Sequence, residues 1–80
     1  MDYSEAVSER IKEYCEKKNI TVNKLATLSG MGQSTVDNIM KNNTKNPTLK
    51  TLRRISQGLG ITVSEFLDFP EMNETQFNDD

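Results

Sequence analysis

The sequence predicts a small all-α domain of five helices. Apolar residues recur every three or four positions, helix-start signals repeat along the chain, and no alternating run of β-branched residues is long enough for a strand. The 80 residues include one Cys and no His, which argues against disulfide, zinc and Ser/His chemistry. No apolar run approaches the ~18 residues of a membrane span. We therefore expect one cytoplasmic domain without a signal peptide.

The first helix is expected at residues 4–18. Its apolar residues recur at three- and four-residue spacing, with charged residues between them, and are Ala6, Val7, Ile11, Tyr14 and Cys15. Cys15 follows Ile11 by four residues and Val7 by eight, which places it on the same helix face. Its thiol is therefore predicted to be buried as a small apolar filler.

Four more helices are predicted at residues 22–29, 33–41, 48–58 and 63–68. An apolar residue and a small or hydroxyl capping residue mark each start, and Thr62 with Glu65 forms a capping box. Gly30 is expected to end the second helix, and Gly58 with Gly60 to end the fourth. The domain is thus placed at residues 1–69. The acidic residues 70–80 form either a tail or a short packing arm.

The second and third predicted helices are joined by Ser29-Gly30-Met31-Gly32. This segment has the length and glycine content that a helix-turn-helix requires. The small Ala26 allows the two helices to approach closely, and Gly30 can adopt the positive φ that follows a helix end. The sequence therefore predicts a helix-turn-helix within residues 22–41.

The third helix has a polar face suited to base recognition. With its apolar residues turned inward, it presents Gln33, Ser34, Asp37, Asn38 and Lys41. Gln and Asn amides can bond both N6 and N7 of adenine, and a Ser hydroxyl is adaptable, so we predict base contacts by Gln33, Ser34 and Asn38. Asp37 either accepts from cytosine N4 or pairs with Lys41, and we favour the pairing.

Charge is distributed unevenly along the chain. Residues 19–60 hold six basic residues and one acidic residue, a net charge of +5, whereas residues 61–80 hold six acidic residues and no basic one. The positive middle favours a polyanion partner, although solvated helix faces can give similar counts. The residues predicted to contact DNA phosphates, without reading sequence, are Thr21, Lys41, Asn42, Asn43 and Lys45.

From about Arg10 to Phe69 the chain resembles the lambda-repressor-like, XRE-type helix-turn-helix family of phage repressors, Cro-like proteins and small bacterial regulators. The matching residues are Arg10-Ile11-Lys12, Ile20 to Ala26, Gly30, Gln33-Ser34-Thr35-Val36, Lys45 to Leu49, Leu52, Leu59-Gly60-Ile61 and Val63 to Leu67. The resemblance implies five helices, with the second and third reading DNA, and a homodimer on a palindromic operator. It also implies base contacts by Gln33, Ser34 and Asn38 and a phosphate contact by Lys45.

Two positions depart from the family pattern. Val22 stands where the family very often has Gln, a side chain that braces a phosphate and the first base-reading residue, so the departure bears on affinity. Asn42-Asn43 stands where a Gly is typical, and Asn can adopt the same left-handed backbone at small energetic expense.

The leading hypothesis is a sequence-specific DNA-binding transcriptional regulator, most simply a repressor, that acts as a homodimer on double-stranded DNA. It is expected to need no cofactor, metal or small-molecule effector. An enzyme is not expected, because the sequence contains no acid/base pair beside a recognisable nucleophile. The alternative is a protein-interaction module of the same fold, antitoxin-like or regulator-sequestering, with weak or no DNA binding. Net acidity, Val22 and Asp37 favour this alternative, as does an acidic tail with Phe69, Met72 and Phe77. Such a tail can pack on its own domain, bridge a dimer or bind the basic surface of another protein.

Overall fold

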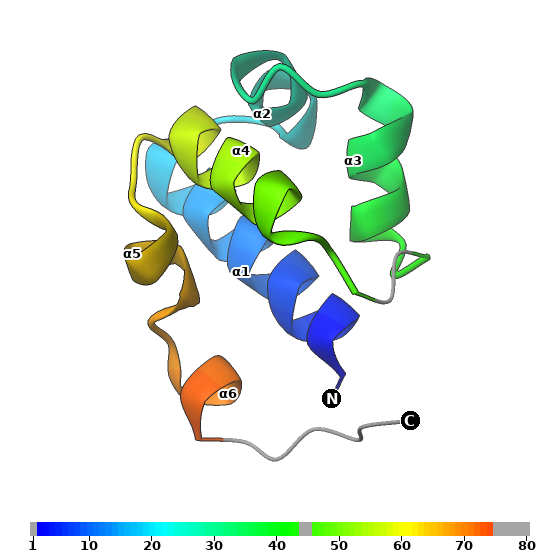
Figure 1. Cartoon of the computed structure of the whole chain (residues 1–80). Helices are drawn as coiled ribbons and strands as arrows, with labels where there is room; N and C mark the ends of the chain where they lie inside the picture. The colour runs from blue at the N-terminus through cyan, green and yellow to red at the C-terminus, as the bar shows by residue number, and fades with distance from the viewer. Residues whose placement is uncertain (1, 44–45, 75–80) are drawn as a thin grey trace.

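The computed structural model describes residues 2–43 and 46–74, which form six helices around one core (Figure 1). The helices are α1 (Tyr3–Lys18), α2 (Val22–Leu28), α3 (Gln33–Met40), α4 (Leu49–Leu59), α5 (Val63–Leu67) and α6 (Pro70–Asn73). In Figure 1, α4 lies along α1, with α2 and α3 towards one side of this pair and α5 and α6 towards the other. In the part of the chain that the structure describes, every helix is too short or too polar to span a membrane.

The all-α class is confirmed, and each of the five predicted helices is present with both ends within one residue of the prediction. The predicted helix starts depend on hydroxyl caps that the structure contains. The Oγ1 atoms of Thr21 and Thr48 accept hydrogen bonds from the backbone N–H groups of Lys24 and Thr51, at 3.0 and 3.1 Å. Both halves of the Thr62 capping box are formed. These caps satisfy backbone donors that have no partner within the helix.

The described residues contain one helix more than predicted, because Pro70–Asn73 forms α6. Pro70 occupies the first turn, where its missing N–H is not needed. Asn73 Nδ2 donates to the carbonyls of Leu67 and Phe69, at 2.9 and 3.0 Å, and Met72 packs against the core. This part of the chain therefore packs onto the domain, as the packing-arm alternative expects, whereas residues 75–80 lie outside the described ranges.

The core is built from the apolar faces of α1 to α5. Its largest fully buried apolar side chains include Phe66, Ile11, Leu25, Ile39 and Ile55. Cys15 is 5% exposed, and burial raises the pKa of its thiol because the thiolate would be desolvated. The prediction that Cys15 is a buried filler is therefore confirmed.

Gly58 was expected to end the fourth helix, but the structure places it inside α4 and ends the helix at Gly60, whose φ is 74°. The reason for a glycine at position 58 is the close approach of α2. A Cβ atom on Gly58 would lie 2.3 Å from Ser29 Oγ and 3.1 Å from the Ser29 backbone nitrogen. Gly58 therefore sets the distance between α4 and the end of α2.

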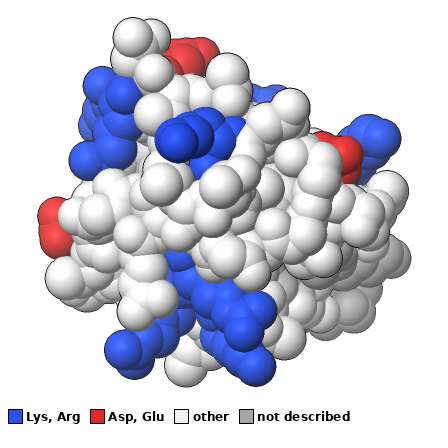
Figure 2. Space-filling view, turned by 90° about the horizontal axis from the view of Figure 1, so that it is seen from above, with Lys and Arg blue, Asp and Glu red and all other residues white. Residues whose placement is uncertain are grey.

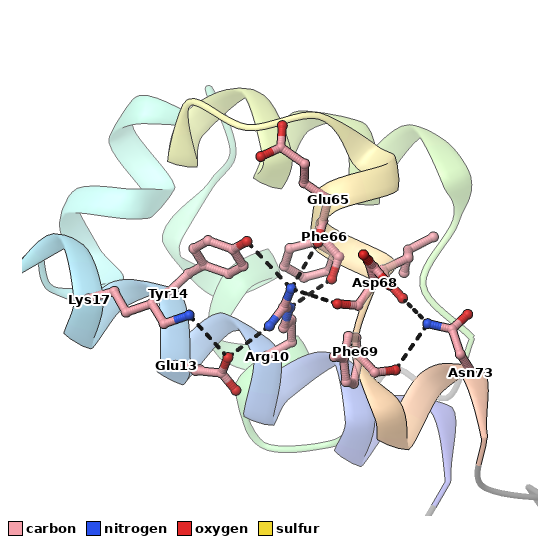
Figure 3. A network of polar contacts seen from close by, with 10 residues as sticks. Arg10, Glu13, Tyr14, Lys17, Glu65, Phe66, Asp68, Phe69 and Asn73 are labelled. Carbon is pink, nitrogen blue, oxygen red and sulfur yellow. Dashed lines mark hydrogen bonds and ion pairs between the residues drawn. The ribbon is translucent and has the colours of Figure 1, made fainter.

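Arg10 connects α1 to the carboxyl end of α5 (Figure 3). Its Nε donates to the Phe66 carbonyl at 2.8 Å, and its Nη2 donates to the Glu65 and Asp68 carbonyls at 2.8 and 3.3 Å. The guanidinium also lies over the rings of Tyr14 and Phe69, at 4.6 and 4.9 Å from the ring centroids. Arg10 thus supplies a donor to the Phe66 carbonyl at the end of α5 and a second donor to the Glu65 carbonyl, which also accepts from the Asp68 N–H at 3.3 Å.

Candidate nucleic-acid interface

A tight turn connects α2 to α3 and sets their relative orientation. Gly30 has φ 67°, as predicted for a residue that follows a helix end. The Met31 N–H then donates to the Ala26 carbonyl at 3.0 Å, and the Met31 side chain packs against the core. Ala26 is buried, so the two helices approach closely at this small side chain. The turn therefore holds the start of α3 against α2 and the core.

The two faces of α3 differ sharply. Val36 and Ile39 are each 1% exposed, and Met40 is half-buried against the core. Gln33, Ser34 and Asn38 are all exposed. The structure thus places the three predicted base-contacting residues on the same helix, with their side chains available to a ligand and the opposite face anchored in the core.

Polar contacts already orient two of these side chains. Gln33 Nε2 donates to Asp37 Oδ1 at 2.9 Å, and Asn43 Nδ2 donates to Asn38 Oδ1 at 3.5 Å. Gln33 keeps its Oε1 acceptor and a second Nε2 hydrogen, which are the two groups that adenine N6 and N7 require.

The favoured pairing of Asp37 with Lys41 is wrong. No ion pair joins these two described residues, and Asp37 accepts from Gln33, one helical turn earlier. Lys41 is the C-cap of α3, with φ −89° and ψ 5°, so it already departs from helical backbone geometry. The spacing of four residues therefore does not give a helical pair at this position.

The predicted phosphate contacts lie at the two ends of the α2–α3 unit. Thr21 caps the start of α2, and Lys41, Asn42 and Asn43 follow the end of α3, all of them exposed. Lys45 lies outside the described residues. Asn42 has φ 62°, which confirms that an Asn adopts the left-handed backbone here.

The Asn42 side chain makes contacts that the sequence did not reveal. Its Oδ1 accepts from Ser4 Oγ at 3.3 Å and from Ser8 Oγ at 3.1 Å. These serines belong to α1 and precede Asn42 by 38 and 34 residues, so no local pattern could have indicated the contact. These bonds use only Oδ1, which cannot donate, so the Nδ2 donor of Asn42 is left available for a phosphate.

Val22 occupies the first position of α2 and is half-buried against the core. Together with Cys15 and Ile20 it lines a shallow surface depression beside the end of α1. An apolar residue is therefore accommodated here by packing. The side chain offers no hydrogen bond to a phosphate or to Gln33.

The basic side chains that the structure describes between residues 19 and 60 are exposed and lack acidic partners. Each of the three ion pairs found in residues 2–43 and 46–74 lies within α1. The exposed basic residues outside α1 within these ranges are Lys24, Lys41, Lys50, Arg53 and Arg54. Figure 2, which views the molecule from the α2 side, shows several groups of Lys and Arg around a largely uncharged surface with fewer acidic groups. This arrangement suits a polyanion better than the net charge of −2 suggests.

Comparison with known proteins identifies the family. A family model described as helix-turn-helix matches residues 11–66. Two proteins named HTH-type transcriptional regulator SinR are similar, with 31% identity for that of Bacillus subtilis (strain 168) and 29% for that of Bacillus licheniformis, each over 72 residues. Each match covers 90% of this chain but 63% of the relative, so the chain spans less than two thirds of their length.

A solved structure agrees over a larger share of its own length. The crystal structure of the prophage Lp1 protein 11 superimposes with a TM-score of 0.83 and 43% sequence identity, and the match covers 92% of this chain and 99% of that one. The order and packing of the helices are therefore shared by the two chains. On the family model, these relatives and this fold, the chain belongs to the XRE-type, lambda-repressor-like helix-turn-helix family.

Proposed function

We propose that this protein is a sequence-specific DNA-binding transcriptional regulator, most simply a repressor, in which α2 and α3 form the helix-turn-helix. The observation that carries the proposal is the exposure of Gln33, Ser34 and Asn38 on a helix whose other face is fixed in the core. A recognition helix needs this combination because base edges are read by side chains held in a fixed orientation. The similarity to regulators named SinR supports the same function.

In this proposal the amino-terminal half of α3 enters the major groove. Gln33 and Ser34 lie in its first turn, which reaches deepest into the groove in helix-turn-helix complexes. Asn38 follows Ser34 by about one turn and faces the same way. The two amides favour adenine, and Ser34 adapts to either base of a pair.

Phosphate contacts hold the helix in register. Thr21 and the first N–H groups of α2 contact one strand, and Lys41, Asn43 and Lys45 contact the backbone at the other end of the unit, with Asn42 Nδ2 as a further donor. The DNA-binding domain comprises residues 1–69. A homodimer would place two such units on a palindrome with half-sites about 34–36 Å apart, and binding there would exclude polymerase.

Loss of a base-reading amide should relax specificity. In Gln33→Ala or Asn38→Ala, we expect discrimination at one or two base pairs to fall about tenfold, because each change removes one two-point contact. Affinity for unrelated duplexes should stay unchanged. The measurement is binding to the preferred site and to each single-base variant of it, and an equal loss on all sequences would argue against base reading.

Lys45→Ala should act differently, since a phosphate contact carries no sequence information. We expect weaker binding to all duplexes and a salt dependence whose log–log slope is shallower by about one. A titration over several salt concentrations measures this slope. A change of preferred sequence in Lys45→Ala would instead place this residue at the bases.

A protein-interaction module remains the second candidate because two observations favour it. Asp37 puts a carboxylate on the proposed reading face, and Val22 packs inward where a phosphate-bracing side chain would help. Binding to a protein partner would respond mildly to salt, whereas DNA binding weakens steeply through counterion release. The salt titration with DNA therefore separates the two candidates.

A further inference from the structure

Asn42, two residues after the last residue of α3, is hydrogen-bonded to the amino-terminal half of α1. Asn42 Oδ1 accepts hydrogen bonds from Ser4 and Ser8, whose residues on α1 are only 1% and 2% exposed. Figure 1 shows α3 ending on the side of the molecule where the amino-terminal half of α1 lies, and this half carries both serines. We call Ser4, Ser8 and Asn42 the serine–asparagine bridge. It connects segments that are far apart in sequence at the point where α3 ends.

A left-handed backbone does not by itself require the side-chain contacts that Asn42 makes. Asn19, the C-cap of α1, also has a positive φ, at 55°, but its side chain has no recorded hydrogen bond to any described residue. At Asn42 the carboxamide adds two long-range hydrogen bonds.

The buried serines make these bonds energetically relevant. Ser8 has a second acceptor, the Glu5 carbonyl at 3.1 Å, and its single proton is shared between the two. Ser4 has one recorded side-chain acceptor within the described residues, which is Asn42. A substitution that removes Asn42 Oδ1 would leave the Ser4 hydroxyl buried without that acceptor, and an unpaired buried donor is unfavourable.

We infer that Asn42 is a positioning residue, which fixes the end of α3 and the residues after it against α1. The backbone around Asn42 is bonded to the last turn of α3, because the Asn42 and Asn43 N–H groups donate to the Ile39 and Asn38 carbonyls at 3.1 and 2.9 Å. The bridge thereby holds the orientation of Asn38 and of the phosphate-contacting residues. This consequence for DNA rests on the proposed function, whereas the bridge itself does not.

The first test compares Asn42→Gly with the matched control Asn19→Gly by amide hydrogen exchange. Both variants replace a left-handed asparagine with glycine, but only Asn42→Gly removes the bridge. We expect the Asn43 N–H to exchange about tenfold faster in Asn42→Gly and at the parental rate in Asn19→Gly. Asn42→Asp should restore slow exchange, because a carboxylate accepts from both serines. Parental or slower exchange in Asn42→Gly would overturn the inference.

The second test removes the two donors on α1 with the double variant Ser4→Ala/Ser8→Ala. The serines are buried away from solvent, and alanine favours the helix, so the variant should fold. We expect about fivefold weaker binding to the selected site with unchanged affinity for random duplex, because base contacts need a fixed helix and phosphate contacts need it less. Unchanged binding to both duplexes would overturn the positioning role. If the parent protein selects no DNA, the proposed function fails, and the exchange measurements still decide whether the bridge exists.

Discussion

Arg10→Met is expected to lower the free energy of unfolding by about 3 kcal/mol. The guanidinium donates to three carbonyls at the end of α5, two of them at 2.8 Å, and its side chain is 8% exposed. Methionine replaces much of the apolar stem but offers no donor. The buried Phe66 carbonyl would lose the Arg10 donor, and the Glu65 carbonyl would keep only the Asp68 N–H, at 3.3 Å. Stacking on Tyr14 and Phe69 would also be lost.

Urea denaturation of the purified variants measures this difference. Arg10→Lys is the matched control, since it keeps the positive charge but cannot place donors at both Nε and Nη2. The free energy of unfolding of Arg10→Lys should lie between that of the parent and that of Arg10→Met. The ion pair with Glu13 contributes little, because Glu13 is half exposed. A loss below about 0.5 kcal/mol in Arg10→Met, the range of ordinary surface substitutions, would contradict this account.

Gly58→Ala should destabilise the protein by about 2 kcal/mol, although alanine is normally the better helix residue. The new methyl group would lie 2.3 Å from Ser29 Oγ and 3.1 Å from the Ser29 nitrogen, so α2 must move away from α4. A side-chain hydroxyl can be relocated, but the backbone of Ser29 cannot move without moving the turn into α3. The substitution should therefore also weaken binding to the selected DNA.

Ser29 offers a double-mutant test of this contact. Its Oγ is buried and has no hydrogen-bond partner among the described residues, so Ser29→Ala alone should be close to neutral. Combined with Gly58→Ala, it removes the nearest clash and should recover part of the stability. Thermal unfolding of the two single variants and the double variant gives the coupling. A higher melting temperature in Gly58→Ala than in the parent would show that α2 and α4 are not closely packed here.

The helix boundaries could be predicted because their causes are local. Thr21, Thr48 and Thr62 each bond a backbone N–H three residues later, and such spacing is visible in a sequence. The outward face of α3 followed in the same way from its helical period. The short helix α6 was missed because its four residues are too few to show a period, and Asn73 secures it through carbonyls that precede it.

Contacts between distant segments could not be predicted. Arg10 bonds carbonyls more than 50 residues later, and Asn42 bonds serines more than 30 residues earlier. Gly58 looked like a helix end because glycine is common there, whereas its role depends on the position of Ser29 in space. The four-residue spacing suggested that Asp37 pairs with Lys41, whereas Asp37 accepts from Gln33 one turn earlier and Lys41 lies at the helix end.

The central claim is that α3 reads DNA sequence, and selection from a random duplex library at low and moderate salt tests it most directly. The parent protein should enrich an inverted repeat, and a folded Gln33→Ala/Asn38→Ala variant should not. Unchanged thermal unfolding of this variant would show that only the reading face was altered. If the folded parent protein binds DNA without selection, or does not bind it, α3 is not a reading helix and a protein partner becomes the expected ligand.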